Sequence, residues 1–201
     1  MKEERLATVF AAIKAYAEQH HVPIMEELGI SQLIELLQRQ QPETVLEIGS
    51  AIGFSALKMA EALPSCRIDT IEREDSRYEK AVEFIEEAGL GEQIRIFHGD
   101  ALEIELSRLL PSYDAIFIDA AKGQYERFFT KYEVLLKPGG VIYCDNMLMH
   151  GMSDQPLSEI PRRKRTMIRN LKQFKEHMMV HPSYETALLP VGDGIMVCKK
   201  K

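Results

Sequence analysis

The sequence predicts an α/β fold built on a mostly parallel sheet with helices on both faces. Three observations support this. Short apolar strand patterns alternate with helical patterns along the chain. The first strand pattern, at residues 45–48, runs into a glycine-containing loop and then a helix, an arrangement typical of nucleotide-type folds. The last two strand patterns, at residues 185–191 and 195–199, flank a Gly-Asp-Gly turn, which predicts a hairpin and an antiparallel final strand.

Length and composition predict one soluble globular domain over residues 1–201. The chain is 45% hydrophobic and 28% charged, and no apolar run approaches the roughly 20 residues that cross a bilayer. The N-terminus lacks the apolar core of a signal peptide, so we expect a cytoplasmic protein with no membrane partner. Cys66, Cys144 and Cys198 are widely separated, which favours reduced core thiols. The net charge of -6 argues against nucleic-acid binding over the whole surface but leaves room for a local basic patch.

Two helical patterns precede the first strand, at residues 3–20 and from about Ser31 to Arg39. We expect residues 1–40 to pack as N-terminal helices on the rest of the domain. The segment between the helices, which contains Met25, has an X-Pro step that predicts an extended start. It can fold over the loop that follows the first strand, or it can be a plain helix connector.

The loop after the first strand carries Gly49 and Gly53, which allow a sharp turn and a close approach to a ligand at the start of a helix. The spacing is G-x-x-x-G, so the dinucleotide fingerprint is absent, as is a phosphate-binding lysine after the second glycine. A ligand with an adenosine and a carboxylate but no phosphate suits such a loop, and S-adenosylmethionine is one. The other interpretation is a glycine turn with a purely structural role.

Further strand patterns at residues 66–72, 93–101, 113–119 and 140–146, with a helix from about residue 77 to 88, complete the parallel sheet. Ligands of such sheets collect at the carboxyl ends of the strands. Glu72 ends the second strand roughly 20 residues after the glycine loop, where a carboxylate can accept hydrogen bonds from ribose hydroxyls. The alternative is a solvated glutamate. The Gly-Asp-Ala sequence that ends in Asp100 and Ala101 can meet the adenine.

Oxygen ligands follow two neighbouring strands, because Asp119 ends the fourth strand and Asp145 and Asn146 end the fifth. Carboxylate and amide oxygens suit Mg²⁺ or a similar cation that keeps positions open for substrate oxygens. The alternative is that each residue has a separate structural role in a turn.

Lys122 lies three residues past Asp119 and can face the same cation. A nearby divalent cation disfavours the charged ammonium, so this lysine can accept a proton from a substrate hydroxyl as an oxygen nucleophile forms. Otherwise it is an exposed loop lysine.

Several segments together carry a resemblance that covers nearly the whole chain: residues 46–49 with 53–55, 71–72, 99–101, 117–122, 145–146 and 189–194. They resemble the cation-dependent O-methyltransferases of the catechol and caffeoyl-CoA type. The resemblance implies a Rossmann-like class I methyltransferase fold with a seven-stranded sheet, a homodimer, and catalysis by Lys122 and Asp119. The implied contacts of S-adenosylmethionine are Met25, Glu47, Gly49, Ser55, Glu72, Asp100, Ala101 and Asp119. The implied ligands of Mg²⁺ are Asp119, Asp145 and Asn146.

Within this family the chain is most similar to small bacterial members, which implies methyl transfer to 5-hydroxyuridine at the wobble position of a tRNA anticodon loop, giving 5-methoxyuridine. A basic stretch supports an RNA partner, because a helical drawing places several of its side chains on one face, opposite an apolar one. The candidate RNA-binding residues are Arg162, Arg163, Lys164, Arg165, Arg169 and Lys172. The alternatives are a small catechol-like phenol as acceptor, or a regulatory protein that binds S-adenosylmethionine or a nucleotide without catalysis.

Overall fold

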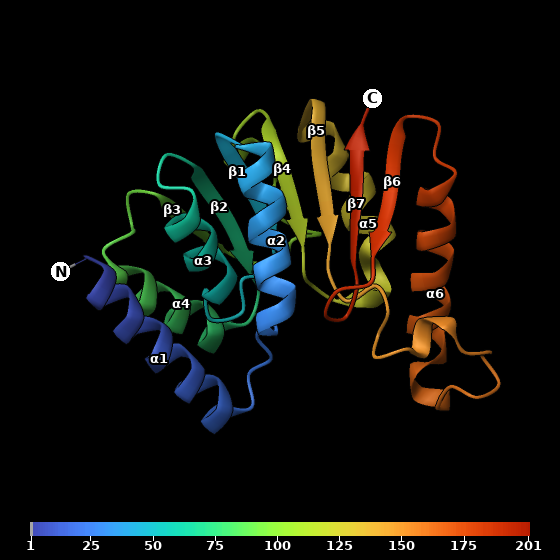
Figure 1. Ribbon diagram of the computed structural model, residues 1–201, viewed down its shortest axis with the longest axis horizontal. Helices are drawn as coiled ribbons and strands as arrows, with labels where there is room; N and C mark the ends of the chain where they lie inside the picture. Colours follow the sequence, from blue (N-terminus) through green and yellow to red (C-terminus); the bar gives the residue numbers. More distant parts are fainter. Residues whose placement is uncertain (1) are drawn as a thin grey trace.

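The computed structural model describes residues 2–201, and its centre is one seven-stranded sheet with the order β3-β2-β1-β4-β5-β7-β6 (Figure 1). Neighbours are parallel from β3 to β5, whereas β7 is antiparallel to both β5 and β6. The fold predicted from the sequence is therefore confirmed. The strands are β1 Thr44–Ile48, β2 Arg67–Glu72, β3 Ile94–His98, β4 Tyr113–Ile118, β5 Leu136–Cys144, β6 Tyr184–Leu189 and β7 Ile195–Lys200.

The central strands are apolar because helices cover both of their faces. Val45 and Phe117 pack into the core on one face, whereas Leu46 and Ile116 pack into the core on the other, as the two-residue period of a strand requires. The chain adds β2 and β3 on one side of β1 and then returns to place β4 on the other side. This reversal leaves a crevice at the carboxyl ends of β1 and β4, where ligands of such folds bind.

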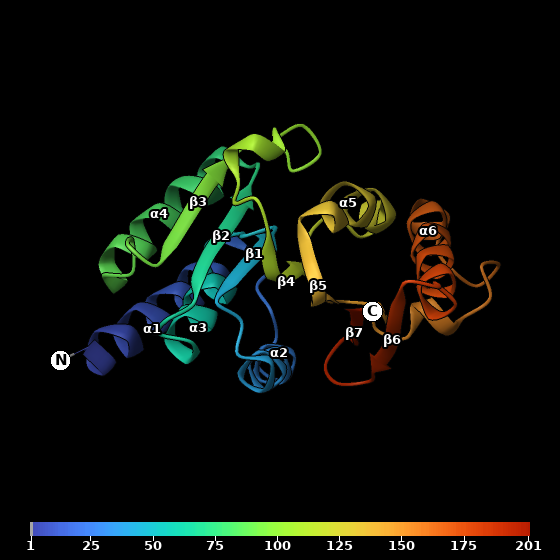
Figure 2. The ribbon, with the colours of Figure 1, turned by 90° about the horizontal axis from the view of Figure 1, so that it is seen from above.

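The first half of the chain supplies the helices of one face, and Figure 2 shows α1, α2 and α3 together on that side. Their buried residues and those of α4 belong to one core cluster. Lys80 of α4 lies 5.0 Å from the ring centroid of Tyr16 of α1, which ties the first helix to the domain. The helices are α1 Lys2–His20, α2 Glu27–Gln40, α3 Phe54–Ala62 and α4 Asp75–Ala88.

The second half of the chain supplies α5 Tyr125–Tyr132 and α6 Arg162–Met179, which cover the opposite face (Figure 2). Helix α5 was not predicted from the sequence. Its signal was present, because Tyr125, Phe128, Phe129 and Tyr132 are buried at helical spacing. Short 3-10 helices complete the chain: η1 Leu106–Arg108, η2 Lys122–Gln124, η3 Glu133–Leu135 and η4 Met152–Asp154.

Two boundaries differ from the expected ones. Helix α2 begins at Glu27 rather than near Ser31, since its first turn carries an acidic side chain that interacts favourably with the helix dipole. Strand β5 begins at Leu136 rather than at residue 140, because Leu136 pairs with Tyr113 across a register shift.

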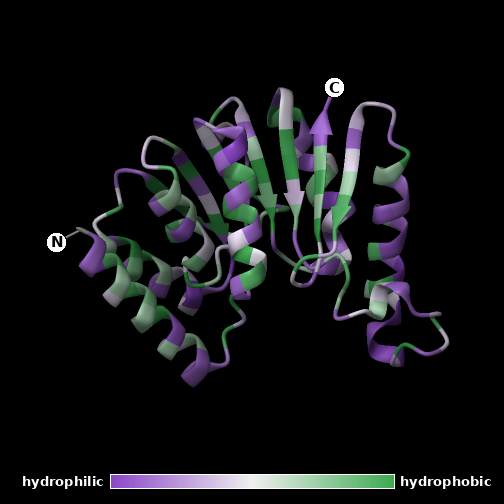
Figure 3. Cartoon of the chain, viewed as in Figure 1, coloured by the Kyte–Doolittle hydropathy of each residue, from purple (hydrophilic) through white to green (hydrophobic). Residues whose placement is uncertain are grey.

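Hydropathy follows the layers, with apolar residues concentrated in the central strands and polar ones along much of α6 (Figure 3). Among residues 2–201, no helix has the length and apolar character needed to cross a membrane.

Candidate functional site

A cavity of about 490 Å³ lies at the carboxyl ends of the parallel strands. One end is lined from the first three strands, the extended segment before α2 covers it, and the other end is lined from β4 and β5. The structure therefore brings together most of the residues that the sequence singled out. Those that line the cavity are Met25, Gly49, Ser55, Glu72, Asp100, Ala101, Asp119, Lys122, Asp145 and Asn146.

The glycine loop is held tightly against β2 and β4. The backbone N–H groups of Gly49 and Ser50 both donate to the carbonyl of Ile71, at 3.0 and 3.1 Å. Gly49 has a φ of +97°, and a Cβ at this position would lie 2.2 Å from the carbonyl oxygen of Asp119. Only glycine fits there. The Ser50 hydroxyl is buried without a hydrogen-bond partner among the described residues, so a polar ligand atom in the cavity can satisfy it.

Glu72 presents a fixed carboxylate to the same end of the cavity. Its Oε2 accepts a hydrogen bond from the N–H of Ala51 at 2.8 Å, and its Oε1 accepts from the N–H groups of Arg73 and Glu74, each at 2.9 Å. Both lone pairs of Oε1 are used, whereas Oε2 still has one free for a ligand hydroxyl. The ribose contact of Glu72 stays a prediction, for which this carboxylate is in place.

Glu47 was predicted to contact the cofactor, but it is not among the residues that line the cavity. It is fully buried beneath the loop, where its carboxyl group accepts hydrogen bonds from the hydroxyls of Ser55 and Thr70. Burial raises the pKa of Glu47 to about 7, and the two hydrogen bonds oppose that rise. Glu47 thus supports the loop from below and connects it to β2.

The predicted metal ligands lie together at the other end. The Asn146 side-chain amide donates to Asp119 Oδ1 at 2.9 Å and to Asp145 Oδ2 at 3.0 Å, so it bridges the two carboxylates. Burial raises the pKa of Asp119 to about 6 and that of Asp145 to about 7, and the charge of Asp119 adds to the second shift. A cation between them would remove this cost.

The donor set fits a hard divalent cation. It consists of two carboxylates and one amide, which are the oxygen ligands that Mg²⁺ prefers, and rotation of the Asn146 amide turns its oxygen toward the carboxylates. Residues 2–201 contain no group of three or more His, Cys, Asp or Glu side chains arranged to hold a metal. Only a site completed by an amide, water or substrate oxygen is therefore available in this region.

Lys122 begins the short helix η2, and its positive charge lowers the pKa of both neighbouring aspartates against the effect of burial. Two contacts hold this turn: Gln124 N–H donates to Ala121 at 2.8 Å, and the side-chain amide of Asn170 donates to the Gly123 carbonyl at 3.1 Å. Asn170 belongs to α6. Lys122 itself makes no hydrogen bond or ion pair among the described residues, so its amine is free to meet a substrate.

Ser50, His150 and Asp193 are among the residues that line the cavity without having been predicted from the sequence. Asp193 lies in the Gly-Asp-Gly turn, which we interpreted only as a hairpin signal. Its Oδ1 accepts a hydrogen bond from the backbone N–H of His150. The signal for a further role was a charged side chain within the turn that joins β6 and β7.

The six candidate RNA-binding residues of α6 fall into two groups by their contacts. Arg165 donates to the carbonyls of Ile160 and Ser158 at 2.8 and 2.9 Å, and Lys172 donates to the carbonyl of Gln155, so both hold the segment before the helix. The others make no side-chain hydrogen bond or ion pair within residues 2–201. They are Arg162, Arg163, Lys164 and Arg169, of which Lys164 is half-buried and the arginines are exposed.

The chain is similar in sequence and in structure to known O-methyltransferases. A family model described as O-methyltransferase matches residues 2–201. The chain is 32% identical to tapetum-specific methyltransferase 1 of Arabidopsis thaliana, over 100% of this chain and 85% of that protein. A Staphylococcus aureus structure provisionally assigned as a caffeoyl-CoA O-methyltransferase has a TM-score of 0.89 and 32% identity, and covers 96% of this chain and 92% of its own. The O-methyltransferase TomG of Streptomyces achromogenes, solved with S-adenosylmethionine, has a TM-score of 0.80 and 26% identity over 98% and 90%. The chain therefore belongs to the O-methyltransferase family.

Proposed function

We propose that this protein transfers the methyl group of S-adenosylmethionine to the 5-hydroxyl of 5-hydroxyuridine at the tRNA wobble position, giving 5-methoxyuridine, with a divalent cation in the site. The coarser function follows from family membership, since the chain is an S-adenosylmethionine-dependent O-methyltransferase of the caffeoyl-CoA type. The cation and the RNA acceptor are the proposed parts.

The cofactor half of the cavity supports the methyl donor. Glu72 offers carboxylate oxygens for the ribose, Asp100 and Ala101 lie at the end of β3 for the adenine, and the Ser50 hydroxyl lacks a partner. Helix α3 begins at Phe54 beside the cavity, and the loop before it carries no phosphate-binding lysine.

Asp119, Asp145 and Asn146 would hold the cation, which would supply positive charge to stabilise the acceptor oxyanion. In its uncharged amine form, Lys122 accepts the proton of the acceptor hydroxyl at Nζ and becomes an ammonium. The oxygen forms a bond to the methyl carbon as the bond from that carbon to the sulfonium breaks, and S-adenosylhomocysteine leaves. Because no covalent enzyme intermediate is needed, the side chains contribute mainly by positioning the two reactants.

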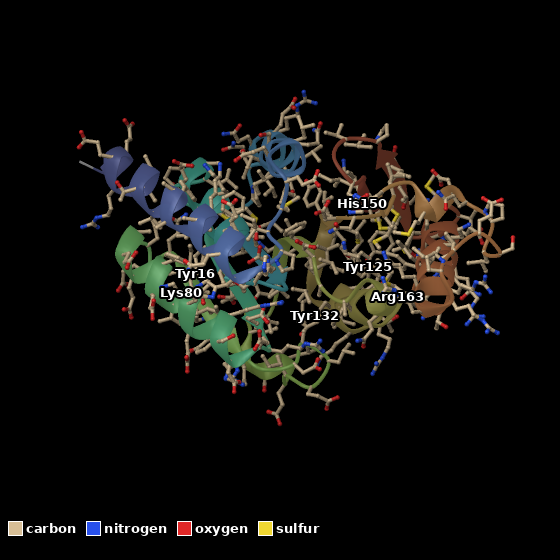
Figure 4. All side chains as sticks on the ribbon, turned by 90° about the horizontal axis from the view of Figure 1, so that it is seen from below. Tyr16, Lys80, Tyr125, Tyr132, His150 and Arg163 are labelled. Atoms are coloured by element: carbon tan, nitrogen blue, oxygen red, sulfur yellow. The ribbon has the colours of Figure 1, made fainter. Side chains whose placement is uncertain are left out.

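The observation that supports an RNA acceptor is the position of the free arginines. Helix α6 contacts the turn that carries Lys122, through Asn170 and through Met167, which lies 3.6 Å from the position of a Cβ on Gly123. Figure 4 shows Arg163 of α6 in the same half of the molecule as Tyr125 and His150, away from Tyr16 and Lys80.

The distribution of charge along the chain also favours an RNA partner, because basic residues outnumber acidic ones only in its second part. Residues 122–201 contain 14 Lys and Arg against 8 Asp and Glu, whereas residues 1–121 contain 11 against 23. The half that carries the base and α6 is thus the half that attracts a phosphate backbone. A single-stranded anticodon loop can present a base to a cavity beside such a surface.

Nucleoside mass spectrometry of tRNA from a strain that lacks the gene tests this proposal. We expect 5-methoxyuridine to disappear and 5-hydroxyuridine to accumulate. A plasmid copy of the wild-type gene should restore the modification, and a copy with Lys122→Ala should not. Unchanged 5-methoxyuridine in the deletion strain would exclude the tRNA acceptor.

A small catechol-like phenol is the second candidate acceptor. It is favoured by the names of several relatives, among them caffeoyl-CoA O-methyltransferase 2 of Petunia hybrida, which is 34% identical over 85% of this chain and 72% of that protein. Purified protein that methylates catechol but no tRNA would select it.

A further inference from the structure

Asp193 places a further carboxylate at the end of the cavity that contains the predicted metal ligands and Lys122, where the acceptor would bind. Its side chain is only 7% exposed, yet the residue lines the cavity that also contains Lys122 and Asn146. One of its oxygens, Oδ1, accepts the backbone N–H of His150. The other, Oδ2, is buried and has no hydrogen-bond partner among the described residues. A buried carboxylate oxygen without a donor is costly, so a donor from a bound molecule is expected here.

The turn that carries Asp193 is fixed to the loop that follows the predicted metal ligands. Met147 N–H donates to the carbonyl of Gly194 at 3.0 Å, and Leu148 N–H donates to the carbonyl of Asp193 at 2.8 Å. A Cβ on Gly194 would lie 2.6 Å from the Leu148 side chain, so the turn and the loop pack closely. The position of Asp193 relative to Asn146 is therefore set by backbone contacts, as an orienting group requires.

The order in which the predicted cofactor residues, the metal ligands and Asp193 follow one another along the sheet indicates which part of an acceptor lies near Asp193 Oδ2. The predicted cofactor residues follow β1, β2 and β3, the metal ligands and Lys122 follow β4 and β5, and Asp193 precedes β7, the next strand in the sheet. An acceptor whose reacting oxygen faces the cofactor and whose neighbouring oxygen also faces the metal ligands extends toward Asp193.

We infer that Asp193 orients the acceptor by accepting, at Oδ2, a hydrogen bond from a ring N–H that neighbours the two oxygens of the acceptor. This inference rests on the proposed function. The edge of 5-hydroxyuracil presents O5, O4 and N3–H in that order, which matches the order of cofactor, metal ligands and Asp193. Catechol presents two oxygens but no N–H. A site built to pair with a donor discriminates against analogues that lack it, because its own buried group then stays unpaired.

Small ring compounds without any RNA test this inference. The probe 3-hydroxy-2-pyridone carries a hydroxyl, a neighbouring carbonyl and a ring N–H, its N-methyl derivative lacks that donor, and catechol lacks the nitrogen. Their dissociation constants are measured by calorimetry with S-adenosylhomocysteine and Mg²⁺ present. We expect the wild-type protein to bind the pyridone about 10- to 100-fold more tightly than the other two compounds.

Asp193→Asn isolates the unpaired atom. Asparagine keeps an oxygen for the His150 N–H and turns the other position into a donor, which opposes a ring N–H. The variant should lose the preference for the pyridone and bind catechol as the wild type does. The matched control is Asp154→Asn, which alters an exposed aspartate paired with Lys175 at 3.1 Å and should keep the preference.

Three results would overturn the inference. The first is a wild-type protein that binds all three compounds with equal affinity, and the second is an Asp193→Asn protein that keeps the preference for the pyridone. The third is an Asp193→Asn protein that loses affinity equally for all three compounds, or that loses affinity for S-adenosylhomocysteine. The last result would mean that Asp193 supports the neighbouring loop, accepts a hydrogen bond from water on the cation or helps to bind the cofactor. A tRNA that still contains 5-methoxyuridine in the deletion strain rejects the RNA acceptor but leaves the pyridone preference standing, so the two failures are distinguishable.

Discussion

The carbonyl oxygen of Asp119 lies 2.2 Å from the point where a Cβ on Gly49 would be. The two predicted functional regions, the cofactor loop after β1 and the metal end after β4, are therefore in backbone contact.

Gly49→Ala should disturb both regions at once. The new methyl group would clash with the Asp119 backbone at a φ of +97°, and the strain should cost about 2–4 kcal/mol of unfolding free energy. Urea unfolding measures the loss, and calorimetry should show weaker binding of S-adenosylhomocysteine. Gly91→Ala is the control, because nothing lies within 4 Å of its Cβ position. Equal stability of the two variants would contradict this account.

Lys122→Ala should lower kcat by about 10²–10⁴-fold, the usual contribution of a positioned general base, and should leave the affinity for S-adenosylhomocysteine unchanged. Single-turnover methyl transfer and calorimetry measure the two quantities. Lys199→Ala, at an exposed position of β7, should change neither. Parallel losses of rate and cofactor affinity would show that Lys122 supports the fold or binds the cofactor.

Cation binding should weaken as the pH falls through about 7 and 6. The carboxyl pKa values of Asp145 and Asp119 are raised to about these values, and protons therefore compete with the cation at a higher pH than usual. The affinity for Mn²⁺, measured by electron paramagnetic resonance, should drop about 20-fold between pH 8 and pH 6. EDTA and Asp145→Ala should each abolish methyl transfer, and full activity in either case excludes the cation.

Arg162→Glu with Arg169→Glu should lower methylation of an anticodon stem-loop more than 10-fold in about 0.15 M salt, because two charges that we propose to face phosphates are reversed. Methylation of catechol should not change, since neither arginine holds another part of the protein. The paired control is Lys199→Glu with Lys201→Glu at the C-terminus, which Figure 1 shows at the opposite end of the strands from the carboxyl ends of β1 and β4. Loss of activity on both kinds of acceptor would mean that the helix has a structural role.

Glu47→Gln should stabilise the protein at alkaline pH. The folded-state pKa of Glu47 is about 7, above its ordinary value of 4.5, so its stabilising contribution is complete below pH 4.5 and is lost as the pH rises to about 7. Glutamine cannot ionise and avoids this loss, which amounts to about 3 kcal/mol. Urea unfolding between pH 5 and 8 should show the difference growing with pH, and Glu92→Gln, at an exposed position, should show none.

The fold could be predicted from the sequence because its signals are local. The apolar run into Asp119, the glycine loop and the hairpin turn each fix one element, and the order of the elements fixes the sheet. Cavity residues that end parallel strands, such as Glu72 and Asp119, followed from the same rule, since these strand ends converge. The roles of Glu47 and Arg165 could not be predicted, because a side chain that turns under a loop or back onto a carbonyl has the same sequence as one that faces a ligand.

Helix α6 meets the turn of Lys122 through the hydrogen bond from Asn170 to Gly123. The surface proposed to hold RNA and the proposed base are thus directly connected. Contacts made far from the reacting oxygen can then be used to align Nζ with it, so a docked stem-loop should be converted faster at saturation than a free nucleoside. Under this arrangement, shortening the RNA should cost turnover as well as affinity.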